Sequence, residues 1–372
     1  MKNARGLRSA NHALRRLLKG LFADVQAFRW VAGLLLLFTV LGTGCSTFVA
    51  NRIAQAPNTY PSWLAPSAPV LLSFNESLLA NSPERFADVG PPPARLRYRV
   101  VEPAEYHLKV IPTKFVEGGE VRYKFEFRAE MPRANPWTAA PRGTVVLLHG
   151  YGLAEFAMAP WAFRLAEEGW RCVLVDLRGH GKSTGKKIYY GVTEAGDMSQ
   201  LLDVLGNRGQ LAPPVAAIGD SYGAALALRW KTMDPRVGRV VAIAPYGVLS
   251  SAVLNICHDY ASFLPRALIR AGLGQLPAVL DVKGDELDTT TVLARHPVTA
   301  LFVSGAEDNV VPLADLQRLY AQALPGSEMI VVPGAMHETL PYHFSELVPP
   351  VLAWLSASEQ GNRRLPGLPG VQ

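Results

Sequence analysis

A serine stands at the centre of the most reactive pattern in the sequence, Gly219-Asp220-Ser221-Tyr222-Gly223. An apolar run that begins at Val215 precedes it and a run rich in alanine and leucine follows it, so we expect a sharp turn between a strand and a helix. Such a turn projects the hydroxyl from the end of the sheet, and the amino end of the helix stabilises negative charge beside it. The pattern predicts that Ser221 acts as a nucleophile.

A serine hydroxyl is a weak nucleophile unless a base removes its proton, so a histidine and an acid that orients it are expected downstream. Two acids, Glu307 and Asp308, follow the apolar run at residues 300–303, and His337 follows the next such run. Both positions would lie at the carboxyl ends of parallel strands, where open α/β sheets build their sites. His343 is an alternative base, but it falls beyond this loop, in or near the last helix.

Buried strands that alternate with amphipathic helices would position these residues. Continuous apolar runs, typical of strands buried on both faces, recur along the chain. They begin at Val145, Cys172, Val215, Val240, Ala300 and Met329. Helix-length amphipathic stretches separate most of them, which predicts an α/β fold with a doubly wound, mainly parallel sheet. Period-two runs between Leu96 and Arg128 predict antiparallel strands at the leading edge of this sheet.

Residues 246–297 break this alternation. The interval is too long for a simple crossover and its pattern is mostly helical, so we predict a helical cap inserted over one end of the sheet. Its apolar side chains would shield an acyl chain, although the same residues would equally form the core of the cap. They are Tyr260, Phe263, Leu264, Leu268, Ile269 and Leu273.

The sequence from Gly143 to Leu355 resembles the α/β-hydrolase family. Five motifs in the order of the family carry the resemblance. They are Val146-Leu-Leu-His149-Gly-Tyr-Gly152, Asp176-Leu-Arg-Gly-His-Gly-Lys-Ser183, Gly219 to Gly223, Gly305-x-x-Asp308 and Gly334-x-x-His337. The length of the cap and the Arg-Gly-His-Gly turn are most similar to monoacylglycerol lipases, lysophospholipases and related carboxylesterases.

This resemblance implies a catalytic triad in which Ser221 is the nucleophile, His337 the base and Asp308 the acid that orients the base. It also implies that the backbone N–H groups of Tyr151 and Tyr222 form the oxyanion hole. The implied reaction is hydrolysis of a small-molecule carboxylic ester, such as an acylglycerol or a lysophospholipid, through an acyl-enzyme intermediate. No metal or organic cofactor is expected. A serine peptidase, an acyltransferase and a non-catalytic envelope binding protein remain alternatives.

The first 45 residues are predicted to be a signal peptide or a membrane anchor. Basic residues precede fifteen uncharged residues, 30–44, as in secretory signals. Gly42-Thr43-Gly44-Cys45 also resembles the lipobox of bacterial lipoproteins, which implies that Cys45 is the lipidated first residue of the mature chain. Alternatively, the uncharged run extended to Ala50 gives about 31 Å of helix, enough for an uncleaved anchor. Both forms place the body in the cell envelope, outside the cytoplasm and attached to the membrane; a buried core helix is the third alternative.

Proline and charge are distributed unevenly along the chain. Residues 46–95 are rich in proline and are predicted to form an extended tether to a hydrolase domain at residues 96–372.

The formal net charge is +6, and the residues before Cys45 account for all of it because they hold seven basic side chains and one acidic one. A neutral body argues against nucleic-acid binding, since phosphate recognition needs clustered Lys and Arg.

The composition is typical of a globular protein with a large core. Of the 372 residues, 49% are hydrophobic and only 3 are cysteines. This excludes a disordered chain and a disulfide scaffold. Cys172 and Cys257 are interpreted as small buried hydrophobic residues.

Overall fold

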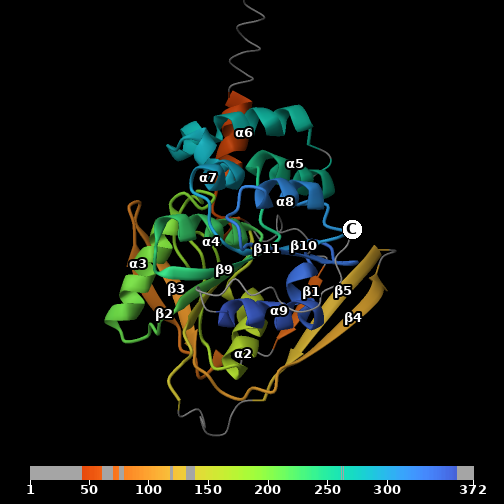
Figure 1. The fold of residues 1–372 in the computed structure, drawn as a ribbon. Helices are drawn as coiled ribbons and strands as arrows, with labels where there is room; N and C mark the ends of the chain where they lie inside the picture. The colour runs from red at the N-terminus through yellow and green to blue at the C-terminus, as the bar shows by residue number, and fades with distance from the viewer. Residues whose placement is uncertain are drawn as a thin grey trace, which may run out of the picture.

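The computed structural model describes residues 44–60, 70–74, 79–117, 120–130, 139–260, 262 and 264–357. Its central sheet has eight strands (Figure 1). In order across the sheet they are β11 (Glu328–Val332), β10 (Leu301–Gly305), β9 (Val237–Ile243), β8 (Val215–Asp220), β6 (Thr144–Leu148), β7 (Arg171–Val175), β3 (Ala94–Val101) and β2 (Arg85–Val89). The strands from β11 to β7 pair in parallel, and β3 and β2 add antiparallel pairs at one edge. The predicted fold class is confirmed.

Helices cover both faces of this sheet. On one face they are α3 (Glu194–Asn207), α4 (Tyr222–Met233) and α8 (Leu313–Tyr320), and on the other α2 (Ala159–Glu167) and α9 (Phe344–Ser356). Successive residues of a strand pack on opposite faces of the sheet. Val146 packs in the core beneath α3, α4 and α8, and its neighbour Val145 packs in the core beneath α2 and α9. Burial on both faces explains why these strands are continuous apolar runs rather than alternating ones.

Further helices lie beyond the carboxyl ends of the parallel strands, within the interval predicted as a cap (Figure 1). They are α5 (Leu249–Tyr260), α6 (Arg266–Leu280), the 3₁₀ turn η5 (Gly284–Leu287) and α7 (Thr289–Arg295). The N-terminal helix, residues 44–54, stands beside α6 and is drawn in red in Figure 1. A Cβ added to Gly272 of α6 would come within 2.4 Å of Val49 Cγ1, so these two helices are in close contact.

The extended tether predicted for residues 46–95 is wrong for much of that segment. The N-terminal helix begins it, Val70–Phe74 is strand β1, and β2 is the edge strand of the central sheet. Prolines lie at the connections, as in the turn of residues 90–93 between β2 and β3. Because proline marks the ends of elements, the composition indicated these connections and concealed the elements between them. Residues 61–69 and 75–78 lie outside the described residues.

A second, three-stranded sheet lies apart from the first. β4 (Lys109–Glu117) and β5 (Glu120–Arg128) form an antiparallel hairpin, and β1 pairs in parallel with β5. The sequence places this hairpin at the leading edge of the central sheet, which is wrong, because that edge is occupied by β3 and β2. Phe125 and Phe127 of the second sheet pack against Tyr342 instead. Their ring centroids lie 5.2 and 5.8 Å from that of Tyr342, respectively. The hairpin therefore buries its apolar face on the C-terminal region.

Most of the predicted leader, residues 1–43, lies outside the described residues. Within the part of the chain that the structure describes, no helix is both long and apolar enough to cross a membrane. The three cysteines are free thiols: Cys45 is exposed, Cys257 is half-buried and Cys172 is buried. The burial of Cys172 raises the pKa of its thiol well above the usual value, which makes it unreactive.

Candidate active site

The turn around Ser221 joins β8 to α4 in a strained backbone conformation. Ser221 has φ 50° and ψ −107°, outside the regions that L residues favour, and its amide donates to the carbonyl of Ile243 at 2.8 Å. Sterics require the flanking glycines. A Cβ at Gly219 would lie 2.1 Å from the Gly223 oxygen, and one at Gly223 would lie 2.2 Å from the Leu148 oxygen. Close backbone contact therefore sets the serine at the carboxyl end of the sheet.

Ser221, His337 and Asp308 come together from three separate loops. Nε2 of His337 lies 2.9 Å from Ser221 Oγ, and its Nδ1 lies 2.8 Å from Asp308 Oδ2. The other carboxylate oxygen, Oδ1, accepts the amides of Val310 and Val311 at 2.9 and 2.7 Å. The backbone amides hold the buried Asp308 carboxylate in place. The carboxylate in turn orients the imidazole so that Nδ1 donates to it and Nε2 faces the serine hydroxyl.

The loop that carries His337 is supported on both sides. Gly334 has φ 67°, a conformation that glycine adopts without strain. The hydroxyl of Thr339 accepts the amide of Met336 at 3.1 Å. Tyr342, in the 3₁₀ turn η6 (Leu340–Tyr342), packs against the second sheet. These contacts fix the position of the imidazole relative to the serine.

The alternative acid and base lie elsewhere. Glu307 is exposed, and its backbone amide donates to the carbonyl of Ala335 at 3.0 Å. His343 precedes α9, where its Nδ1 lies 3.8 Å from a carboxylate oxygen of Glu346. The structure thus brings Asp308 and His337, rather than these neighbours, to the serine.

The electrostatic environment raises the pKa values of two groups at this site. Burial would lower the pKa of His337, but the hydrogen bond and charge of Asp308, with the charges of Asp220 and Glu338, outweigh burial and raise it above the usual value. Burial raises the pKa of Asp220 to about 7; the charge of His337 opposes this shift, and the Asp308 and Glu338 carboxylates add to it. Within the described part of the chain, Asp220 Oδ1 has no hydrogen-bond partner. A carboxyl group that titrates near neutrality therefore lies beside the serine.

Two further histidines are buried beneath this site. Nε2 of His149 accepts the amide of Leu177 at 3.1 Å, and its Nδ1 donates to the carbonyl of Gly150 at 2.8 Å. The ring of His180 packs against that of His149 with centroids 5.0 Å apart. Burial lowers the pKa of His180 to about 3 and also lowers that of His149. Both imidazoles are therefore neutral and support the loop above them.

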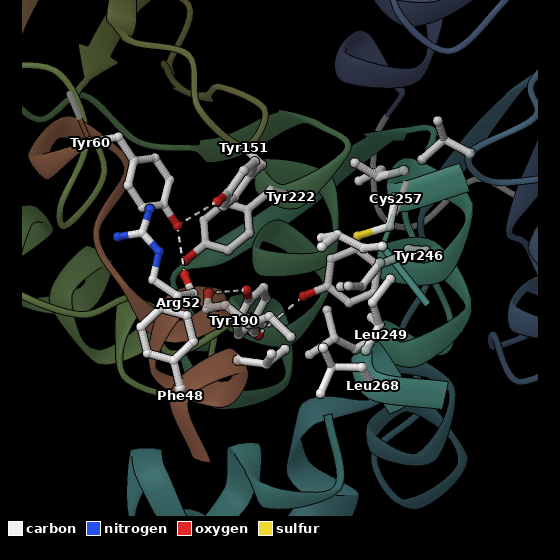
Figure 2. A pocket seen from close by; sticks show the side chains of 18 of the residues that line it. Phe48, Arg52, Tyr60, Tyr151, Tyr190, Tyr222, Tyr246, Leu249, Cys257 and Leu268 are labelled. Carbon is white, nitrogen blue, oxygen red and sulfur yellow. Dashed lines mark hydrogen bonds between the residues drawn. The ribbon is translucent and has the colours of Figure 1, made fainter. Parts of the chain in front are cut away.

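A cavity of about 580 Å³ extends from Ser221 between the N-terminal helix and helices α5 and α6. Tyrosines 60, 151 and 222 gather on one side of it, facing Leu249, Cys257 and Leu268 on the other (Figure 2). Arg52 is the single charged side chain among the described lining residues, and none of them is acidic. No cluster of His, Cys, Asp or Glu suited to a metal ion occurs in the described residues. The volume is within the range of sites that enclose a small ligand.

The apolar residues predicted in the cap divide into three groups. Leu264, Leu268 and Ile269 line the cavity. Leu273 packs against the core of the sheet. Phe263 and the side chain of Tyr260 lie outside the described residues. Part of this apolar stretch therefore faces the cavity, and part belongs to the core.

Tyr151 and Tyr222 lie beside Ser221 in the cavity lining. Tyr222 is the first residue of α4, where backbone N–H groups have no acceptor within the helix. Tyr151 follows β6, and its hydroxyl lies 3.4 Å from that of Tyr60. The role of their two amides as oxyanion donors stays a prediction.

Sequence reasoning missed the wall of the cavity that the N-terminal helix forms. Phe48, Val49, Arg52 and Ile53 line the cavity from this helix. Their spacing of three and four residues is the signal of a helix face. That signal was available in the sequence, next to the proline-rich composition that suggested a tether.

The central sheet, the strained serine turn and the Ser221, Asp308 and His337 loops at strand ends together define an α/β hydrolase. The chain has the α/β-hydrolase fold and is similar to members of that superfamily. A family model described as serine aminopeptidase, S33, matches residues 139–286. An esterase from Pyrococcus furiosus has a similar fold in two crystal forms, with TM-scores of 0.54 and 0.53 at 20% identity, covering 78% of this chain and 96% or more of the esterase. At this identity the likeness shows the fold alone.

Curated relatives match about half of the chain. The uncharacterized protein YqkD of Bacillus subtilis is 23% identical over 188 residues, which cover 48% of this chain and 59% of YqkD. A monoacylglycerol lipase of Mycolicibacterium smegmatis is 28% identical over 220 residues, which cover 58% of this chain and 70% of the lipase. The chain thus spans less than two thirds of the length of YqkD.

Proposed function

We propose that the protein is a serine hydrolase that cleaves carboxylic esters. The observation that carries this proposal is the continuous hydrogen-bonded series from Asp308 through His337 to Ser221 at one end of an apolar cavity. In this mechanism His337 accepts the proton of Ser221 as the hydroxyl attacks the ester carbonyl. It then protonates the leaving alcohol, and finally activates the water that releases the acid from the acyl-enzyme.

The other parts of the site support the same chemistry. Asp308 stabilises the imidazolium that forms when His337 takes the proton. The amides of Tyr151 and Tyr222 would stabilise the tetrahedral oxyanion, because the amino end of α4 carries partial positive charge.

Peptide hydrolysis is a second candidate, because the matching family model is that of a serine aminopeptidase. An aminopeptidase must bind the free ammonium group of its substrate, and a buried cation needs a paired carboxylate. None of the described residues that line the cavity is acidic. A neutral acyl ester suits this lining better, and the similarity to a monoacylglycerol lipase favours an acylglycerol.

We also propose that the protein is attached to a membrane and faces the exterior of the cytoplasm. The support is the basic and apolar sequence of residues 1–45, together with the exposure of Cys45 at the start of the N-terminal helix. Mass spectrometry of the mature chain tests this proposal. A chain that begins at a lipid-modified Cys45 supports a lipoprotein, an intact Met1 supports an anchor, and a mature chain without either feature refutes attachment.

Labelling by a fluorophosphonate probe tests the hydrolase itself. Wild-type protein should be labelled and should release p-nitrophenol from p-nitrophenyl butyrate in a burst, and Ser221→Ala should lose both. Ser250→Ala is the matched control, since Ser250 is an exposed serine outside the cavity. Folded wild-type protein that is neither labelled nor active on esters would refute the proposal.

A further inference from the structure

The N-terminal helix, residues 44–54, presents one face to the cavity. The lining residues from this helix recur every three or four positions: Gly44, Cys45, Phe48, Val49, Arg52 and Ile53. That spacing places them on one side of an α-helix. Thr47 and Asn51 are exposed and do not line the cavity. The helix is therefore a wall of the cavity and not merely a connection to it.

The body of the protein holds this helix in place. The hydroxyl of Tyr190 donates to the carbonyl of Ile53 at 2.6 Å, and the amide of Ile188 donates to the carbonyl of Ala54 at 2.9 Å. Ala50 and Ala54 are fully buried. These contacts fix the helix relative to α4 and the serine turn, so its first turn has a defined place at the cavity.

The cavity reaches the surface at the first turn of this helix. Gly44 and Cys45 are exposed, as is Phe48, which keeps 66% of its surface accessible. Leu264, just before α6, also lines the cavity and is 38% exposed. Deeper lining residues such as Leu249 and Ile269 are buried. The opening is thus flanked by large apolar side chains that face solvent.

The chain directly before this opening carries the predicted membrane attachment. The uncharged residues 30–44 end where the helix begins, and Cys45 is its second residue. Phe48 is only about 5 Å of helix rise beyond Cys45. A lipid on Cys45 or an uncleaved anchor would therefore hold the first turn at the bilayer surface. The free energy falls when an apolar phase covers the exposed side chains of Phe48 and Leu264.

We propose that the N-terminal helix holds the opening of the cavity against the bilayer, so that a single-chain lipid ester passes from the leaflet along Phe48 to Ser221. This rests on the hydrolase function and the membrane attachment proposed above. The apolar lining suits an acyl chain, and a cavity of about 580 Å³ is of a size to enclose one small ligand. The substrate class is therefore a monoacyl lipid that resides in the membrane.

A comparison of two substrates tests this proposal on the full-length protein in phosphatidylcholine vesicles. One substrate is monooleoylglycerol, which partitions into the bilayer, and the other is p-nitrophenyl butyrate, which is soluble. Phe48→Asp should lower the ratio of the monooleoylglycerol rate to the butyrate rate about tenfold, because apolar contact with the lipid is lost. Asn51→Asp adds the same charge one turn away on the exposed side and should keep the ratio within about twofold.

Each other outcome contradicts a distinct claim. Equal losses on both substrates in Phe48→Asp, or the same fall in the ratio in Asn51→Asp, would overturn the role of the helix in delivery. Wild-type protein that cleaves the butyrate but not monooleoylglycerol would overturn the lipid substrate and leave the serine hydrolase intact. Inactivity on both would refute the hydrolase function itself. Phe48→Ser and thermal melting of the variants control for folding.

Discussion

The two ends of the cavity are built by different physical means. Around Ser221, hydrogen bonds of 2.8 and 2.9 Å and tight backbone contacts set the atomic positions. At the opening, Phe48 and Leu264 offer exposed apolar surface. Proton transfer requires positions held within fractions of an ångström, whereas an acyl chain requires only apolar contact. In the proposed function, the reaction type therefore depends on one end of the cavity and the choice of substrate on the other.

The largest effect should follow a change to the acid at the reactive end. Asp308→Asn should lower kcat for p-nitrophenyl butyrate by about 10⁴-fold, because an amide stabilises the wrong imidazole tautomer. The matched variant Glu307→Gln, one residue earlier on the exposed side of the loop, should change kcat by less than about twofold. A greater loss in Glu307→Gln would show that the acid has been assigned to the wrong residue.

A methyl group in the serine turn should destabilise the fold. The Cβ of Gly223→Ala would meet the Leu148 carbonyl at 2.2 Å, so we expect a loss of about 3 kcal/mol in the free energy of unfolding. Gly274→Ala, in α6, meets nothing within 4 Å and should instead gain about 0.5 to 1 kcal/mol. Urea unfolding measures both values. Similar stabilities for the two variants would contradict the tight packing of the turn.

A smaller change is expected at the apolar wall. Leu268→Ala should raise KM for p-nitrophenyl octanoate about tenfold, because contact with roughly two methylene groups is lost. The rise for p-nitrophenyl acetate should be smaller, since its acyl group does not extend along α6. Leu324→Ala, an exposed leucine outside the cavity, is the control. If the two esters respond equally to Leu268→Ala, this wall does not contact the acyl chain.

The smallest effect should be a displacement of the pH profile. His337 must be neutral to accept a proton, and its pKa is raised, so kcat/KM should rise as pH increases through that raised value. Asp220 favours the protonated imidazole, hence Asp220→Asn should move this inflection to lower pH. Glu307→Gln should leave it in place. A displacement of the Asp220→Asn profile to higher pH would contradict the electrostatic account.

Features governed by local sterics and burial were predictable from the sequence. The glycines at 219 and 223 follow from backbone contacts that any serine turn of this kind must make, and the central strands follow from burial on both faces. The choice of Asp308 over Glu307 came from resemblance to the family. Only the fold shows its physical basis, which is the burial of one carboxylate and the exposure of its neighbour.

Features that depend on distant segments were not predictable. Strand β1 pairs with β5 in a register that joins residues 70 and 123, and such pairing is decided by tertiary context. The spacing of residues 48–53 indicates a helix face, but the place of this helix depends on the contact between Val49 and Gly272, which the sequence does not reveal. The wall of the cavity and the second sheet therefore emerged only from the structure.

The contact between Gly223 and Leu148 also has a consequence for the speed of the reaction. It presses the amino end of α4 against the end of β6, from which the loop with Tyr151 continues. The two amides predicted to contact the oxyanion therefore have their positions fixed by rigid backbone and not by movable side chains. With the oxyanion role predicted for these amides, their dipoles would already be preorganised when the chain folds, and little reorganisation energy would be added to the barrier of the chemical step.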